Sequence, residues 1–370
     1  MQERAYFPGP DIEWEQILPE SAGFDDRRLR SAVDEIREAE TLWDKDVKIS
    51  AMAQMAEPAP YNEIIGPTRE RGGPNGLILR GGRIVAEWGD TSRVDMTFSA
   101  SKSYLALCAG LAFDGGLLPD FSRPVREQVD DGNFDPPHNS RITWEHLLQQ
   151  TSEWEGTLWG KPEFIDRGRD VYKSGPQTQK GTQRELREPG TFYEYNDVRV
   201  NVASLALLRI WRRPLPDVLR ECIMDPIGAS GTWEWHGYRN SQVVIDGTTM
   251  SSVSGGGHWG GGLFISSRDH ARVGYLMLRK GLWKDRRLLS ERFIELALTP
   301  SKPNPDYGYM IWLNCSRSLV PGASAGSFFF RGAGSNVVWV EPEKDLVAVF
   351  RWIRKDYINE ACRSILAAIR

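Results

Sequence analysis

Strand-like segments occur in the first and the last third of this chain, with a helix-rich stretch between them. Residues 76–80 and 83–88 flank Gly81-Gly82, a pair that tolerates the positive φ of a tight hairpin turn. Three apolar runs in the last third have the same strand character: residues 328–330, 336–340 and 346–353. Strands so far apart along the chain predict one antiparallel sheet assembled from both ends.

Helical patterns surround these strands and fill the middle of the chain. They predict helices over residues 25–40, 105–113, 144–150, 198–211, 268–279, 290–298 and 357–369. We therefore expect an α/β (α+β) fold with an N-terminal arm (1–18), an α/β sheet domain (19–116 and 246–370) and a mostly helical lobe (117–245) without a strong strand. The polar segment 160–188 is predicted to be a mobile loop over a site, and a ligand is expected in the cleft between the lobes.

The charge and the apolar pattern limit the partners of the protein. Its 370 residues include 46 basic and 50 acidic ones, so it lacks the excess of positive charge that is typical of proteins that bind nucleic acids or membrane surfaces. The first ten residues do not resemble a secretory signal, and no apolar run approaches membrane-spanning length. We expect a reduced, cytoplasmic protein that acts on a small molecule, with no nucleic-acid or membrane partner; the sequence does not indicate an oligomeric state.

Metal and cofactor motifs are not indicated either. The four cysteines lack metal-ligand spacing, and the five histidines form no H-x-x-x-H or H-E-x-x-H pattern. The glycine-rich run 255–262 is not followed by the lysine and Ser/Thr pair of a phosphate-binding loop. We expect neither a metal nor a cofactor.

Ser99 and Lys102 carry the strongest chemical signal, because they stand three residues apart at the mouth of an apolar helix. One helical turn brings the lysine over the serine. A lysine shielded from water there can accept the serine proton, and the helix N-terminus favours developing negative charge. The same S-x-x-K spacing is also common by chance at the start of surface helices, so it needs support from other motifs.

Two further motifs supply such support. Tyr195 follows Pro189-Gly190-Thr191, and a tyrosine beside a cationic lysine loses its proton more easily, so it can relay protons. The alternative is an ordinary loop tyrosine that packs its ring. Residues 330–335 are rich in glycine at a strand end, where the N–H of Ala333 can pair with that of Ser99 to hold an oxyanion. The alternative is a glycine bulge before a hairpin.

The glycine-rich run 255–262 is expected to bring two backbone segments together near the cleft, with His258 and Trp259 lining the pocket. A purely structural glycine turn before residues 263–265 remains the alternative for the glycines themselves.

The order of these motifs resembles the serine β-lactamase-like superfamily, which includes class C β-lactamases, D-alanyl-D-alanine carboxypeptidases and family VIII esterases. The resemblance runs from about residue 20 to the C-terminus and includes residues 99–105, 142–148 and 261–272. It implies a β-lactamase/transpeptidase-like fold. It also implies that Ser99 is the nucleophile, that Lys102 and Tyr195 handle protons, and that the N–H groups of Ser99 and Ala333 bind the oxyanion.

Two positions depart from that family pattern. The usual Tyr-x-Asn motif ends here in Asp197, whose charge near Lys102 is expected to raise the lysine pKa and shift the role of base toward Tyr195. The usual Lys-Thr-Gly strand motif is Phe330-Arg331-Gly332, in which phenylalanine cannot bind a substrate carboxylate. Arg331 can, if its side chain faces the cleft, although a strand-end side chain can equally point away.

The first hypothesis is therefore a serine hydrolase that cleaves a small ester or amide through an acyl-enzyme on Ser99, with an esterase-like activity preferred. The aromatic-rich sequence and the missing lysine favour an apolar or aromatic substrate over a penicillin. The alternatives are an amide or β-lactam hydrolase of the same family, and a non-catalytic ligand-binding protein on this scaffold. The expected substrate-binding residues are Asp197, His258, Trp259, Phe330, Arg331 and Gly332.

Overall fold

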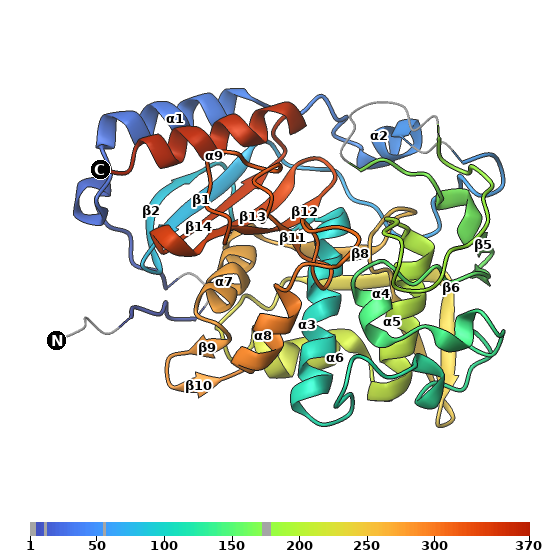
Figure 1. Ribbon diagram of the computed structural model, residues 1–370. Helices are drawn as coiled ribbons and strands as arrows, with labels where there is room; N and C mark the ends of the chain where they lie inside the picture. Colours follow the sequence, from blue (N-terminus) through green and yellow to red (C-terminus); the bar gives the residue numbers. More distant parts are fainter. Residues whose placement is uncertain (1–4, 11–12, 55–56, 172–178) are drawn as a thin grey trace.

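A six-stranded antiparallel sheet, formed from both ends of the chain, is the centre of the fold (Figure 1). The computed structural model describes residues 5–10, 13–54, 57–171 and 179–370. The strands of this sheet are β1 Asn75–Arg80, β2 Arg83–Trp88, β11 Trp312–Leu313, β12 Phe328–Gly332, β13 Asn336–Glu341 and β14 Leu346–Arg351. Their order is β11-β12-β13-β14-β1-β2, so the predicted pairing of an early hairpin with the late strands is confirmed.

Both faces of this sheet are covered by helices, as Figure 1 shows: α1 (Asp26–Glu38) and α9 (Ile358–Ala367) lie on one face and α7 (Ser267–Leu278) on the other. Alternate residues of a strand point to opposite faces. Leu77 and Leu79 accordingly belong to the core on the α7 side, whereas Ile78 belongs to the core beneath α1 and α9. The sheet is thus buried on both sides, which explains its continuous apolar strands.

The helix that follows the S-x-x-K serine is buried along most of its length. It is α3 (Ser101–Asp114), and its residues from Ser101 to Ala112 are inaccessible to solvent or nearly so. The remaining helices are α2 Val47–Gln54, α4 Trp144–Leu148, α5 Asp197–Trp211, α6 Leu215–Leu219 and α8 Glu291–Ala297. The predicted helices are confirmed within a few residues at their ends, and α5, α6 and α8 pack against α3.

The prediction of no strong strand between residues 117 and 245 is wrong. A second sheet has the order β3-β8-β6-β7, built from β3 Asp95–Met96, β6 Glu234–Ile245, β7 Thr248–Val253 and β8 Gly262–Ile265. The only apolar side chains buried along the long strand β6 are Trp235, Tyr238 and Ile245, so its apolar pattern is too sparse to detect. The expected lobe boundary at 245/246 consequently falls inside the β6–β7 hairpin.

Short two-stranded ribbons complete the fold: β4 Thr157–Leu158 with β5 Lys161–Pro162, and β9 Leu282–Trp283 with β10 Arg286–Arg287. Part of the expected N-terminal arm (1–4 and 11–12) and part of the expected loop 160–188 (172–178) lie outside the described residues. The end of the arm adds to the sheet edge, where Gln16 bridges Ile84. No helix in the described ranges combines the length and apolar character needed to cross a membrane.

Candidate active site

Ser99 lies in a tight 3-10 turn, η2 (Phe98–Ala100), directly before α3. Phe98 has a positive φ of 51°. This conformation is unfavourable for any residue other than glycine, so surrounding contacts must stabilise it. Its ring packs edge-on against Trp43 and Trp352. The Ser101 hydroxyl donates to the Phe98 carbonyl (2.6 Å) and accepts from the Leu263 N–H (2.9 Å), which ties the turn to β8. The nucleophile candidate is therefore held rigidly.

Lys102 reaches back over this turn, as its spacing predicts. Its Nζ donates a hydrogen bond to Ser99 Oγ over 3.0 Å, and its side chain is 1% exposed. The same ammonium forms an ion pair with Asp197 Oδ1. Once an amine in such a position has lost its own extra proton, it can receive the proton of the serine hydroxyl that it contacts.

Asp197, the first residue of α5, is shared between two cations. Its Oδ1 contacts Lys102 and its Oδ2 contacts Arg169, while its backbone N–H donates to Asp166 Oδ2 (2.6 Å). Burial opposes ionisation of this carboxyl, but the charges of Lys102 and Arg169 outweigh it and hold the pKa of Asp197 far below its usual value. The backbone of Gly256 lies against this pair, since a Cβ there would come within 3.0 Å of both Asp197 Oδ1 and Lys102 Nζ.

Tyr195 precedes α5 and places its ring beside the same lysine. The Lys102 Nζ lies 4.6 Å from the ring centroid, and the ring stacks on Trp312 with centroids 5.7 Å apart. Asn196, between Tyr195 and Asp197, caps α5 by accepting from the N–H groups of Val198 and Arg199. This cap fixes the direction in which the chain enters the helix, so the tyrosine and the aspartate approach Lys102 together.

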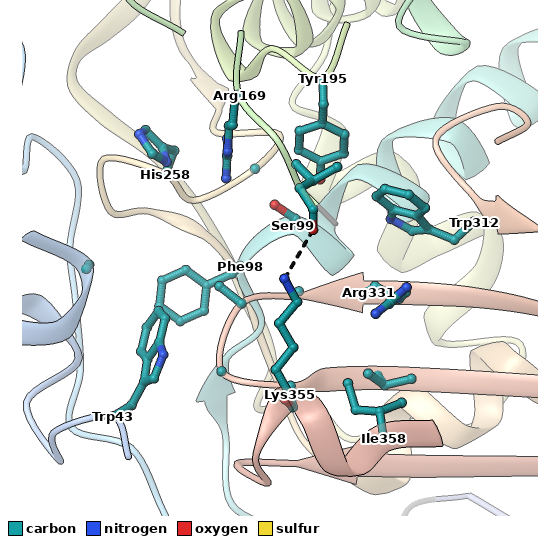
Figure 2. Close-up of a pocket in the computed structure, with 18 of the residues that line it drawn as sticks. Trp43, Phe98, Ser99, Arg169, Tyr195, His258, Trp312, Arg331, Lys355 and Ile358 are labelled. Carbon is teal, nitrogen blue, oxygen red and sulfur yellow. Dashed lines mark hydrogen bonds between the residues drawn. The ribbon is translucent and has the colours of Figure 1, made fainter. Parts of the chain in front are cut away.

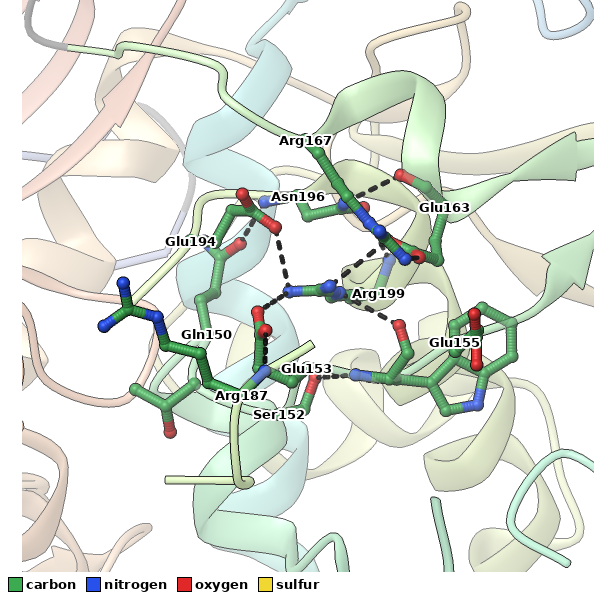
Figure 3. A network of polar contacts seen from close by, with 12 residues as sticks. Gln150, Ser152, Glu153, Glu155, Glu163, Arg167, Arg187, Glu194, Asn196 and Arg199 are labelled. Atoms are coloured by element: carbon green, nitrogen blue, oxygen red, sulfur yellow. Dashed lines mark hydrogen bonds and ion pairs between the residues drawn. The ribbon is translucent and has the colours of Figure 1, made fainter. Parts of the chain in front are cut away.

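A buried network of ion pairs holds the first turn of α5 in place (Figure 3). Arg199 of α5 is 2% exposed and pairs with Glu153 (2.8 Å), Glu163 (3.2 Å) and Glu194 (3.2 Å). Glu194 directly precedes Tyr195, so the network connects three separate segments to the helix that carries the site. Removing one member would leave buried charges unpaired, which is costly.

A cavity of about 360 Å³ opens in front of Ser99 (Figure 2). Aromatic and aliphatic side chains form much of its wall: Trp43, Phe98, Val171, Trp312, Val337 and Ile358. Four cationic side chains also line it: Arg169, Lys180, Arg331 and Lys355. Desolvation and the charge of Arg331 lower the pKa of Lys355 from its usual value. The cavity therefore combines apolar surface with positive charge.

The end of β12 meets the nucleophile turn through backbone contact. A Cβ on Gly332 would come within 3.0 Å of the Thr97 carbonyl oxygen, so only glycine permits this approach. Ala333, the next residue, lines the cavity with Ser99. The two segments whose N–H groups are the expected oxyanion donors thus lie side by side.

Three expected substrate-binding residues do not reach the cavity wall. Phe330 is fully buried against the ring of Tyr104, because neighbouring strand residues point to opposite faces and Arg331 takes the cavity side. Trp259 is fully buried behind His258, which does line the cavity. Asp197 lies beneath the cavity with its carboxylate engaged by two cations, as described above.

Sequence reasoning missed the charged residues that surround His258. In the described part of the chain, Glu57, Asp166 and His258 offer ligand atoms within 4.8 Å of one another, a spacing that could hold a metal ion. The Lys180 ammonium lies among them, 3.0 Å from Asp166 Oδ1 and 2.9 Å from His258 Nε2, and it pairs with Glu57. The polar composition of 160–188 was a signal for this region, but no spacing distinguishes Asp166 and Lys180 from surface charges.

Comparison with known proteins gives a family and a fold. A family model described as Beta-lactamase matches residues 64–360. Among solved structures, a beta-lactamase from Mycobacterium bovis superposes with a TM-score of 0.54 and 18% identity, over 87% of this chain and 97% of that one. EstCE1, described as a hydrolase with promiscuous acyltransferase activity, gives 0.59 and 15% over 93% and 99%. A family VIII carboxylesterase gives 0.58 and 15% over 87% and 95%. No curated protein matches the sequence.

Proposed function

The chain belongs to the beta-lactamase family, and from that premise we propose that it is a serine hydrolase that cleaves a small ester or amide through an acyl-enzyme on Ser99. One observation carries the proposal: the Lys102 ammonium lies 3.0 Å from the Ser99 hydroxyl, which faces a cavity. A buried amine that merely stabilised the fold would not need a hydroxyl partner on a cavity wall.

In the proposed mechanism, the reacting form is the one in which Lys102 has lost a proton to solvent and is a neutral amine. Ser99 Oγ then attacks the substrate carbonyl while this amine takes the Ser99 proton. The N–H groups of Ser99 and Ala333 hold the oxyanion of the tetrahedral intermediate. The intermediate collapses, the bond to the leaving group breaks, and the proton passes by way of Tyr195 to the departing oxygen or nitrogen. Water then adds to the acyl ester by the same sequence, which releases the acid and restores Ser99.

An ester is the preferred substrate, with an amide or β-lactam as the alternative. Aromatic and aliphatic side chains form part of the cavity wall, and Phe330 stands buried at the position where β-lactamases carry a lysine. An apolar wall favours an apolar or aromatic acyl group. Esters also need less assistance to expel the leaving group than unactivated amides do.

Intact-mass measurement after treatment with a fluorophosphonate or a p-nitrophenyl ester tests the proposal. We expect a single adduct on Ser99, because among the residues that the structure describes it is the hydroxyl that both contacts a lysine amine and lines the cavity. Ser99→Ala is expected to give no adduct. The matched control is Ser103→Ala, in the first turn of α3, because the Ser103 hydroxyl donates to the Met310 carbonyl instead. A wild-type protein that never gains mass would favour the non-catalytic binding protein.

A substrate carboxylate is proposed to bind Arg331. Its side chain lines the cavity on the side of Lys355, with its guanidinium 5.6 Å from the Trp312 ring centroid. We expect Arg331→Gln to raise KM about 10-fold for mono-p-nitrophenyl glutarate, because a charged hydrogen bond is lost. KM for p-nitrophenyl butyrate, which lacks the carboxylate, should hardly change. Equal effects on both esters would show that Arg331 does not recognise the charge.

A further inference from the structure

Asp197 poses a problem for a lysine base, because a carboxylate in direct contact with an ammonium opposes loss of its proton. The second oxygen of the same carboxylate is bound by Arg169. We propose that Arg169 is a positioning residue that balances the charge of Asp197 and so allows Lys102 to accept the Ser99 proton. This inference rests on the proposed function of Ser99.

The two oxygens of the Asp197 carboxylate bind two different cations. Lys102 holds Oδ1 of Asp197 and Arg169 holds Oδ2, and the carboxylate is only 1% exposed, so water can screen neither contact. Arg169 also lies 3.5 Å from Asp166 and 5.3 Å from the Tyr195 ring centroid. A guanidinium stays charged throughout the working pH range, so it remains a constant counter-charge while the lysine gains and loses a proton.

The charges around Lys102 come from several elements and nearly cancel. The cations are Lys102 of α3, Arg169 and Lys180; the carboxylates are Asp197 of α5, Asp166 and Glu57. Within the described residues, the Lys102–Asp197 pair is also faced by the Ser99 hydroxyl, the Tyr195 ring, the backbone of Gly256, and His258, whose Nδ1 lies 3.9 Å from Asp197 Oδ2. Loss of Arg169 alone would leave one buried carboxylate in excess.

The pH dependence of acylation tests this balance. The rate of acylation by p-nitrophenyl acetate should rise with pH as the base loses its proton. In Arg169→Gln, the unbalanced Asp197 carboxylate stabilises the protonated form of Lys102, so the midpoint should move upward by about one pH unit and the rate at pH 7 should fall about 10-fold. Arg169→Lys should keep the wild-type midpoint. Arg141→Gln is the control, because Arg141 is an exposed arginine paired with Glu188.

Asp197→Asn provides the complementary arm. Alone, it removes the negative charge between Lys102 and Arg169, so the protonated lysine is less stable and the midpoint should move to lower pH. Combined with Arg169→Gln, the midpoint should return toward the wild-type value. This arm stands even if Arg169→Gln fails to fold, as monitored by circular dichroism. An unchanged midpoint in either folded single variant, or a double variant that keeps the Arg169→Gln shift, overturns the inference. Absence of acylation in the wild-type protein would instead overturn the proposed function.

Discussion

Lys102→Ala is expected to lower the acylation rate by roughly 10³-fold while the protein remains folded. The variant loses the amine that lies 3.0 Å from Ser99 Oγ, the one base that contacts this hydroxyl among the described residues. The fold should survive because Asp197 keeps Arg169 as a partner after the lysine is removed. Stopped-flow release of p-nitrophenol measures the rate, and thermal unfolding measures stability.

Lys102→Arg is the matched control for this prediction. Arginine retains the positive charge beside Asp197 but does not give up its proton in proteins, so it cannot act as a base. We expect acylation in this variant to be as slow as in Lys102→Ala. Near-normal acylation in Lys102→Ala would remove the lysine from the mechanism. Activity retained only in Lys102→Arg would assign it an electrostatic role instead.

Gly256→Ala is expected to slow acylation by roughly 10²-fold, because displacement of reacting groups by about 1 Å has effects of this size. A Cβ at this position would come within 3.0 Å of Asp197 Oδ1 and of Lys102 Nζ, so at least one member of the buried pair must move. The same kinetic measurement, combined with a crystal structure of the variant, would detect both the loss and the displacement.

Gly322→Ala is the matched control, since a Cβ there meets no atom within 4 Å. Its acylation rate and unfolding temperature should equal those of the wild-type protein. A Gly256→Ala variant that acylates at the wild-type rate would show that the Lys102–Asp197 contact can shift without consequence for the reaction, which contradicts the mechanism proposed for Lys102.

Much of the fold could be predicted from local patterns. The β1–β2 hairpin follows from Gly81-Gly82 between two apolar runs, and α1 follows from its amphipathic spacing and the Asp25 cap. The β6–β7 hairpin was missed, because few side chains of β6 are both apolar and buried, and backbone pairing with β7 and β8 holds the strand in its sheet. A strand of this kind leaves little trace in a single sequence.

The candidate site also contains contacts that local spacing predicts and contacts that it does not. The contact of Lys102 with Ser99 was predicted because two residues three positions apart meet wherever a helical turn forms. Arg331 and Phe330 could not be assigned to the correct faces in advance, because the register of β12 decides which of the two faces the cavity. Sequence reasoning did not identify Arg169 as a partner of Asp197.

The sequence by itself determined the sheet built from both chain ends, the buried helix α3 and the serine–lysine pair at its mouth, because these depend on residues within one or two turns of each other or on strong apolar runs. Only the tertiary structure decided which distant charges meet that pair. Asp197 and Arg169 are 28 residues apart, and their contact exists because the ion network around α5 and the loop after Asp166 bring both to Lys102. Pairing between charges so far apart depends on packing, which no local pattern encodes.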